Sequence, residues 1–152
     1  MGRLRGVRPP QPPLRPGLTA LPVQLHEALA GILSVQAEDD GSLTIRHGGT
    51  AASLRTVTIA DGLEMVSITQ VLAWDLPDTA ELRKTVAAQA NTTLLGTVAL
   101  SEQPGRRADV MLRYNFPASG LGNSALQTLV LMVLDTGTGV RRVLLDGDPR
   151  HP

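Results

Sequence analysis

Cysteine is absent from the 152-residue sequence, and aromatic residues are nearly so. Without cysteine the chain forms no disulfide, holds no zinc through thiolates and has no thiolate nucleophile, a composition that fits a cytosolic protein. The aromatic residues are Trp74, Tyr114 and Phe116. The core must therefore be built from leucine, valine, isoleucine and alanine.

An excess of charge of either sign is also missing, because 14 basic and 14 acidic residues cancel. Neither the basic character of nucleic-acid-binding proteins nor an attraction to anionic membranes is present in the net charge. The longest apolar run, Leu129 to Leu134, is far shorter than the ~20 residues that span a bilayer. We therefore expect neither a nucleic-acid partner nor a membrane partner.

The composition changes sharply along the chain. The first residues carry four arginines among prolines, with no apolar stretch that could form the core of a secretory signal. We expect residues 1–19 to be a disordered Arg/Pro-rich tail, residues 20–146 to form one domain and residues 147–152 to be a flexible tail. An SH3-type ligand or a nucleic-acid-binding arm is the alternative for the first segment.

Apolar residues at helical spacing predict helices at the start and middle of the domain. The first helix extends from Leu21 to Leu33, with Pro22 tolerated in its first turn. The second begins at Asp78, which is followed three residues later by Glu81 as in a capping box, and ends near Asn91.

A third, longer helix is predicted at the end of the domain. Its apolar seam consists of Leu126, Val130, Val133, Gly137, Val140 and Leu144. Glycine costs about 1 kcal/mol in a helix interior, so we expect a break or kink between Gly137 and Gly139.

Alternating and turn-forming residues predict five strands. Leu43 and Ile45 alternate in the first strand, and Asp61-Gly62 between two β-rich runs indicates a hairpin with a type I′ turn. Two later strands are joined by a polar turn at Pro104-Gly105, and the second ends at Pro117, which cannot donate to a ladder. The predicted fold is a single α+β domain in the order α-βββ-α-ββ-α, with an antiparallel sheet packed against helices.

The strand after the Asp-Gly hairpin has two different faces. Val66, Ile68, Leu72 and Trp74 alternate with a second set that includes Ala73. That second face is mildly apolar, so we expect something to cover it, and methionine adapts to varied partners. The candidate partner-binding residues are Leu63, Met65, Val71, Met111 and Met132. Ordinary core or dimer packing is the alternative role for these residues.

One fragment resembles a dinucleotide-binding fingerprint. In "GLGNSA", Gly120, Gly122 and Ala125 match G-x-G-x-x-A, but that fingerprint belongs in the first βα turn of a longer α/β fold. We interpret the glycines as part of the turn into the last helix, with Ser119 or Asn123 as the cap.

A second fragment, Asp135-Thr136-Gly137, resembles the motif of retroviral-type aspartic proteases, in which a homodimer supplies one Asp per chain. Too few residues follow it for the flap and second loop that those proteases need. His26, His47 and His151 are too dispersed for a metal pair. We therefore expect no enzyme, no metal and no cofactor, with the homodimeric protease as the alternative.

Residues from about Pro22 to Leu145 resemble the YbjN-like, type III secretion chaperone-like superfamily. The resemblance is carried by "LRKTVAAQANTTLLGTVAL", a helix ending in Ala-Asn and followed by an apolar strand, by "ADVMLRYNFP", a strand closing on proline, and by the long final helix. The sequence departs from that pattern at "DTGTG", where the last helix of the family runs on.

This resemblance implies a bacterial cytoplasmic α+β domain, often a homodimer, that has a chaperone-like or regulatory role. In the secretion branch such a domain holds an extended segment of a client protein. We expect a non-catalytic module that binds a protein or extended peptide by strand addition or in an apolar groove. A structural dimer with no client is a further alternative.

Overall fold

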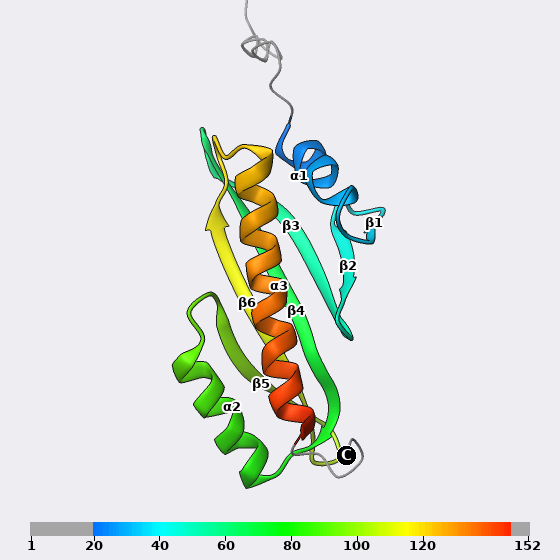
Figure 1. Cartoon of the computed structure of the whole chain (residues 1–152), viewed down its shortest axis with the longest axis vertical. Coiled ribbons are helices and arrows are strands. Elements are labelled where there is room, and N and C mark those ends of the chain that lie inside the picture. Colours follow the sequence, from blue (N-terminus) through cyan, green and yellow to red (C-terminus); the bar gives the residue numbers. More distant parts are fainter. Residues whose placement is uncertain (1–19, 147–152) are drawn as a thin grey trace, which may run out of the picture.

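The structure is a computed structural model that describes residues 20–146 (Figure 1). The two predicted tails, residues 1–19 and 147–152, lie outside the described residues. In chain order the elements are α1 (Leu21–Ala30), β1 (Val35–Ala37), β2 (Leu43–His47), β3 (Thr50–Ala60), β4 (Leu63–Pro77), α2 (Ala80–Thr92), β5 (Thr97–Gln103), β6 (Arg107–Pro117) and α3 (Asn123–Asp146).

The strands form one sheet in the order β1-β2-β3-β4-β6-β5, and all neighbours are antiparallel. The predicted α+β class with an antiparallel sheet is confirmed, and the element order agrees apart from one extra strand. That strand, β1, has only three residues. So short a strand leaves no alternation from which a sequence pattern can identify it.

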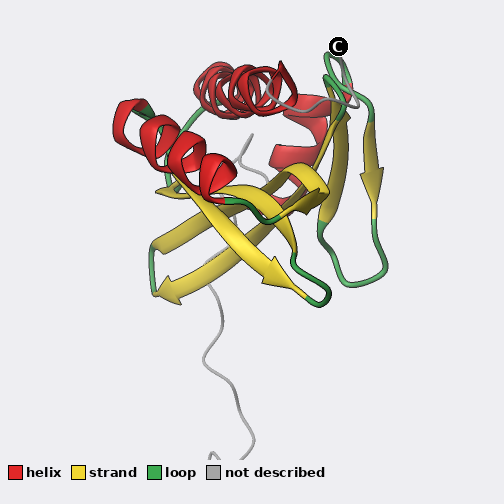
Figure 2. Cartoon of the chain, turned by 90° about the horizontal axis from the view of Figure 1, so that it is seen from below, coloured by secondary structure: helices red, strands yellow, loops and turns green. Residues whose placement is uncertain are grey.

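All three helices lie on the same side of the curved sheet (Figure 2). The long helix α3 crosses β4 and β6, with α1 beside its first half and α2 near its second half (Figure 1). Every residue of the predicted seam on α3 is buried against the sheet. The aliphatic core therefore lies in the single layer between helices and sheet.

Helix α3 is continuous from Asn123 to Asp146, so the predicted break between Gly137 and Gly139 is wrong. Gly137 faces the sheet directly above the fully buried Gln70 of β4, and a Cβ atom at Gly137 would overlap the Gln70 side-chain amide. The glycine allows close packing of helix on sheet, which compensates for its low helix propensity.

The ends of the other two helices differ from the prediction. Helix α1 ends at Ala30 with Gly31 as its C-cap, so Ile32, inside the predicted helix, lies beyond its end and is 47% exposed. Helix α2 is capped by Thr79, whose hydroxyl oxygen accepts from the Leu82 N–H at 3.0 Å. Asp78, predicted as the cap, instead pairs with Arg83.

The Asp61-Gly62 hairpin is confirmed, but its turn is not type I′. Only Gly62 has a positive φ, of 77°, and the β3–β4 register shifts between Thr58 and Ala60. Two successive positive φ values, 56° and 81°, occur at Gly48 and Gly49 between β2 and β3. A type I′ turn requires positive φ at both central residues, and Gly48-Gly49 supplies both.

A bulge in β4 corrects the predicted faces of that strand. Its register against β6 shifts between Val71 and Ala73. Ala73 is consequently 1% exposed on the core side, whereas Trp74 is 53% exposed and its ring lies 5.7 Å from the guanidinium carbon of Arg141 on α3. Simple alternation predicted Ala73 on the opposite face, because one extra residue in a strand shifts the residues beyond it to the other face.

Candidate functional site

The sheet face turned away from the helices, called the open face below, is covered by no helix of residues 20–146 (Figure 2). Strand register places its side chains in rows that run across the strands. Because alternate residues share a face, the register assigns each row for the part of β4 that precedes its bulge, residues 63–71. The open face is the natural location for the predicted partner-binding residues of β4 and β6.

Val71 and Met111, predicted separately, are direct cross-strand neighbours. Ala51 of β3 lies opposite Val71, and Ala99 of β5 lies opposite Met111. Both Val71 and Met111 are half-buried. These four residues form a continuous apolar row across β3, β4, β6 and β5, which we call the lower apolar row.

Met65 belongs to a second apolar row near the β3–β4 turn. It lies opposite Val57 of β3 and Pro117 of β6. Leu63 and Ile59, beyond it in the same hairpin, are 39% and 60% exposed. Met65 of this upper apolar row and Val71 of the lower one are six positions apart along β4, about 20 Å at strand spacing.

Two polar rows lie between the two apolar ones. In the first, Thr69 of β4 is paired with Ser53 of β3 and Arg113 of β6, and Arg113 is paired with Thr97 of β5. In the second, Ser67 of β4 is paired with Arg55 of β3 and Asn115 of β6. The candidate surface is therefore two apolar strips with a polar strip between them, in which Arg55 pairs with Asp40 and Arg113 has no ion-pair partner among the described residues.

Met132 does not join this surface. It lies on α3, on the helical side of the sheet, and is 48% exposed. The structure thus brings together two of the five predicted contact residues, places two more in the upper row of the same face and separates the fifth.

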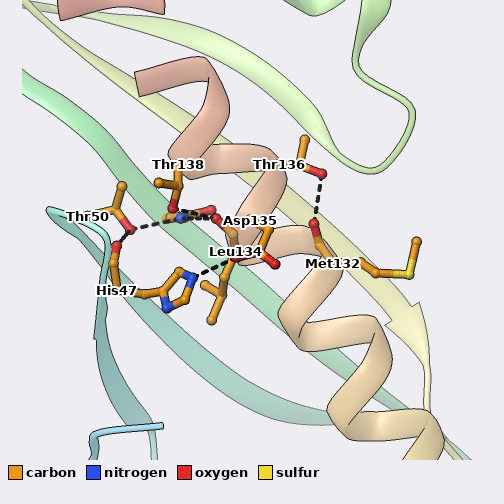
Figure 3. A network of polar contacts seen from close by, with 8 residues as sticks. His47, Thr50, Met132, Leu134, Asp135, Thr136 and Thr138 are labelled. Atoms are coloured by element: carbon orange, nitrogen blue, oxygen red, sulfur yellow. Dashed lines mark hydrogen bonds and ion pairs between the residues drawn. The ribbon is translucent and has the colours of Figure 1, made fainter. Parts of the chain in front are cut away.

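The Asp135-Thr136-Gly137 fragment lies within α3 and makes ordinary structural contacts (Figure 3). The Asp135 carboxylate is 2.8 Å from Nε2 of His47 at the end of β2. The Thr136 hydroxyl donates to the Met132 carbonyl one turn earlier, at 2.7 Å. A helix replaces the strand and loop that present the aspartate in an aspartic protease, so the fragment lacks the setting of that motif.

Beneath that helix turn lies a buried polar network. Gln70 Nε2 donates to Thr50 Oγ1 at 2.8 Å and to the Leu134 carbonyl at 3.1 Å, and Thr50 Oγ1 donates to the His47 carbonyl at 2.6 Å (Figure 3). The Thr138 hydroxyl also donates to the Leu134 carbonyl. The two hydrogen bonds from Nε2 offset part of the cost of burying the Gln70 amide, whose Oε1 has no hydrogen-bond partner among residues 20–146. The network ties β2, β3, β4 and α3 together and gives Gly137 its role.

The titratable groups with displaced pKa values lie outside the candidate surface or at its margin. Hydrogen bonding to Arg83 lowers the pKa of Asp78 and raises that of Arg83. The hydroxyl of Ser42 donates to Asp40 at 2.6 Å and lowers the pKa of Asp40, with Arg55 as a smaller cause. These shifts come from surface ion pairs and a turn, and do not indicate a general acid or base.

Metal ligands do not cluster in residues 20–146: no group of three or more histidine, aspartate or glutamate side chains there could hold an ion. Among the helices of the same range, none is both long and apolar enough to cross a membrane.

No family model matches the chain, and no curated protein matches it in sequence. Among solved structures, YbjN from E. coli superposes with a TM-score of 0.55 at 12% sequence identity, covering 78% of this chain and 84% of that one. The Yersinia pestis type III secretion chaperone SycH, solved in complex with a fragment of YscM2, gives a TM-score of 0.48 at 10% identity, covering 78% of this chain and 97% of that one.

The chain has the YbjN-like fold. The resemblance inferred from the sequence is thereby confirmed at the level of the fold. Helix α3 runs through "DTGTG", so the departure expected there does not exist in the backbone.

Two features of the domain were missed by sequence reasoning. Leu94, in the loop between α2 and β5, is 91% exposed, and no periodicity singles it out. Arg113, on the open face of β6, was not among the predicted contact residues. The alternation of Met111, Arg113 and Asn115 could have identified Arg113, because it places this charged residue on the same face as the predicted contact Met111.

Proposed function

We propose that this chain is a non-catalytic module that binds a protein partner through an extended segment of that partner, in a chaperone-like or regulatory role. The open face of the sheet is its binding surface, with Leu63, Met65, Val71 and Met111 as contacts. Met132 remains a proposed contact at a second, separate position on α3. The proposed cytosolic location rests on composition alone.

The observation that carries this proposal is the row of Val71 and Met111. It places apolar side chains on the central strands of a sheet whose other face already has a complete core under three helices. Side chains that are not needed for the core, and that lie side by side on a broad uncovered surface, are suited to contacts with a partner.

Two fragments that suggested catalysis support the non-catalytic part of the proposal. Gly122 immediately precedes α3, whose first residue is Asn123, and the backbone N–H of Leu126 donates to the Gly122 carbonyl at 3.1 Å. Asp135 pairs with His47 on the surface of the domain. Both fragments therefore have structural roles within the fold.

The test uses the full-length chain as bait in native lysate, beside size-exclusion chromatography with light scattering. The variant Val71→Ser/Met111→Ser removes the lower apolar row, and Lys84→Ser/Ala87→Ser, at two exposed positions of α2, is the matched control. We expect one protein to be enriched by the wild type and the control and lost from the open-face variant. Equal enrichment by all three proteins contradicts the proposed surface.

Light scattering addresses the proposed homodimer. A dimer that retains its partner supports a client-binding module. A dimer that dissociates in Val71→Ser/Met111→Ser, with no partner enriched by the wild type, supports the alternative of a structural dimer that buries the open face against a second copy.

A further inference from the structure

The open face carries a charge feature that the apolar rows do not account for. We infer that it recognises an acidic side chain of the extended partner segment, with the guanidinium of Arg113 as the contact, and that apolar side chains flanking this acid occupy the two apolar rows. This inference rests on the proposed function and specifies the chemistry of the partner.

Arg113 occupies the centre of the open face. Its immediate neighbours across the strands are Thr69 and Thr97, and its side chain is exposed. Within residues 20–146 it has no ion-pair or hydrogen-bond partner. A guanidinium with five N–H donors is thus presented to solvent on a rigid sheet.

The surrounding rows offer no carboxylate that could neutralise it. Asp40, at the margin, accepts from Ser42 and pairs with Arg55. Asp109, at the opposite end of β6, accepts from the Asp75 backbone N–H. A second unpaired arginine, Arg46, extends from β2 on the same face.

This positive character is local to the face. Acidic residues outnumber basic ones among residues 20–146 as a whole, so the unpaired arginines do not simply reflect a basic domain. A partner that brings a carboxylate gains charge-assisted hydrogen bonds, which are stronger than neutral ones. Hydroxyls of Thr69 and Thr97 beside the arginine can donate to the same carboxylate.

Strand spacing converts the rows into a partner motif. Met111 lies two residues from Arg113, about 7 Å, and Pro117 lies four residues away on the other side, about 13 Å. An extended partner segment that runs along β6 places one apolar residue at Met111. Two positions further along the segment, an acidic residue lies at Arg113, and four positions beyond that a second apolar residue lies at Pro117. All these separations are even, so the three side chains share one face of the extended segment.

The same chemistry favours a protein over a single-stranded nucleic acid. Nucleic-acid surfaces on sheets combine positive charge with aromatic platforms for base stacking. Tyr114 and Phe116, the aromatic residues of β6, lie on the helical side of the sheet, where Phe116 is 3% exposed. Trp74, the third aromatic residue, lies beyond the β4 bulge with its ring 5.7 Å from the guanidinium carbon of Arg141 on α3. The rows around Arg113 therefore offer arginines and hydroxyls without an aromatic platform.

The test is selection of peptides from a displayed random 12-residue library against the full-length protein. Wild type is expected to select Asp or Glu with apolar residues two positions to one side and four to the other. Arg113→Glu is expected to select Lys or Arg at that position instead. The control Arg142→Glu, an exposed site on α3, is expected to leave the acidic preference unchanged.

Affinities of the selected peptide and of its Glu→Gln counterpart give the magnitude. We expect at least a tenfold loss of affinity, about 1.4 kcal/mol, on Glu→Gln with wild type and no loss with Arg113→Gln, since only the wild type can form the charge-assisted hydrogen bond. An acidic preference that persists in Arg113→Glu overturns the inference.

Three other outcomes separate this inference from the proposed function. Apolar peptides without a charge preference, lost with Val71→Ser/Met111→Ser, keep the open face as a peptide site and overturn the role of Arg113. Failure to select any peptide, with no partner captured from lysate, overturns both. Arg113-dependent binding of a thymidine oligonucleotide that exceeds peptide binding replaces the acidic peptide by a nucleic acid.

Discussion

The two faces of β4 are made by the same strand and have different kinds of residue. Val66, Ile68 and Leu72 point under the helices and are fully buried, with Gln70 as the single polar residue among them. Ser67, Thr69 and Val71 point the other way and are half-buried. The covered face holds the domain together, and the open face is available for a different task. This comparison predicts how mutations on each face divide between stability and binding.

The largest expected effect comes from neighbouring positions of β6. Leu112→Ala, at a fully buried residue, is expected to lower the free energy of unfolding by about 2–5 kcal/mol because it leaves a cavity under α3. Met111→Ala, one residue earlier on the open face, is expected to cost less than about 1.5 kcal/mol. Urea denaturation followed by circular dichroism measures both. Equal losses at the two positions would remove the distinction between the faces.

The second test concerns the glycines of α3. Gly137→Ala forces a methyl group into the Gln70 amide, and overpacking of this kind costs about 1–3 kcal/mol, partly offset by about 1 kcal/mol of helix propensity. Gly139 has open space around its Cβ position, so Gly139→Ala is expected to stabilise the domain by about 0.5–1 kcal/mol. The difference between the two urea midpoints is the measurement.

A double variant identifies the cause. Combined with Gln70→Ala, which itself destabilises by removing the buried hydrogen bonds, Gly137→Ala is expected to cost less than in the wild type, because the obstructing amide is gone. If the cost is unchanged by Gln70→Ala, the close approach of helix and strand is not what requires a glycine at this position.

The same comparison explains which sequence predictions succeeded. The seam of α3 was identified correctly because a 3.6-residue period continues through glycine as well as through leucine and valine. The break at Gly137 was predicted wrongly because propensity is local, whereas Gln70, which makes the glycine useful, lies on a strand distant in sequence. Ala73 was placed on the wrong face for a similar reason, since no residue pattern in the sequence indicates the bulge after Val71.

The candidate surface was predictable only in part. Alternation places Leu63, Met65 and Val71 on one face of a strand, and Met111 on one face of another. The pairing register places Val71 and Met111 in the same row of the open face and Met65 in another row. That register is set by turns and bulges that the sequence indicates only weakly. Met132 was grouped with them only because it is a methionine, and the residue type does not predict where in the fold the side chain lies.

The smallest expected effect concerns the charge at the margin of the open face. Asp40 has a pKa lowered chiefly by the hydroxyl and backbone N–H of Ser42, and less by Arg55. Its folded pKa therefore lies below its unfolded one, so the associated stability is present above the unfolded value near 3.8 and is lost as the pH falls through the folded value.

Two variants separate the causes. Ser42→Ala is expected to raise the pKa of Asp40 markedly and Arg55→Met only slightly, as measured by NMR titration of the carboxyl carbon. At neutral pH Arg55→Met is expected to leave the urea midpoint nearly unchanged, because exposed ion pairs contribute little. A larger pKa increase in Arg55→Met than in Ser42→Ala would make the arginine the main partner of Asp40. Arg55 would then be firmly committed to this pair, and Arg46 and Arg113 alone would remain to attract an acidic segment to the open face.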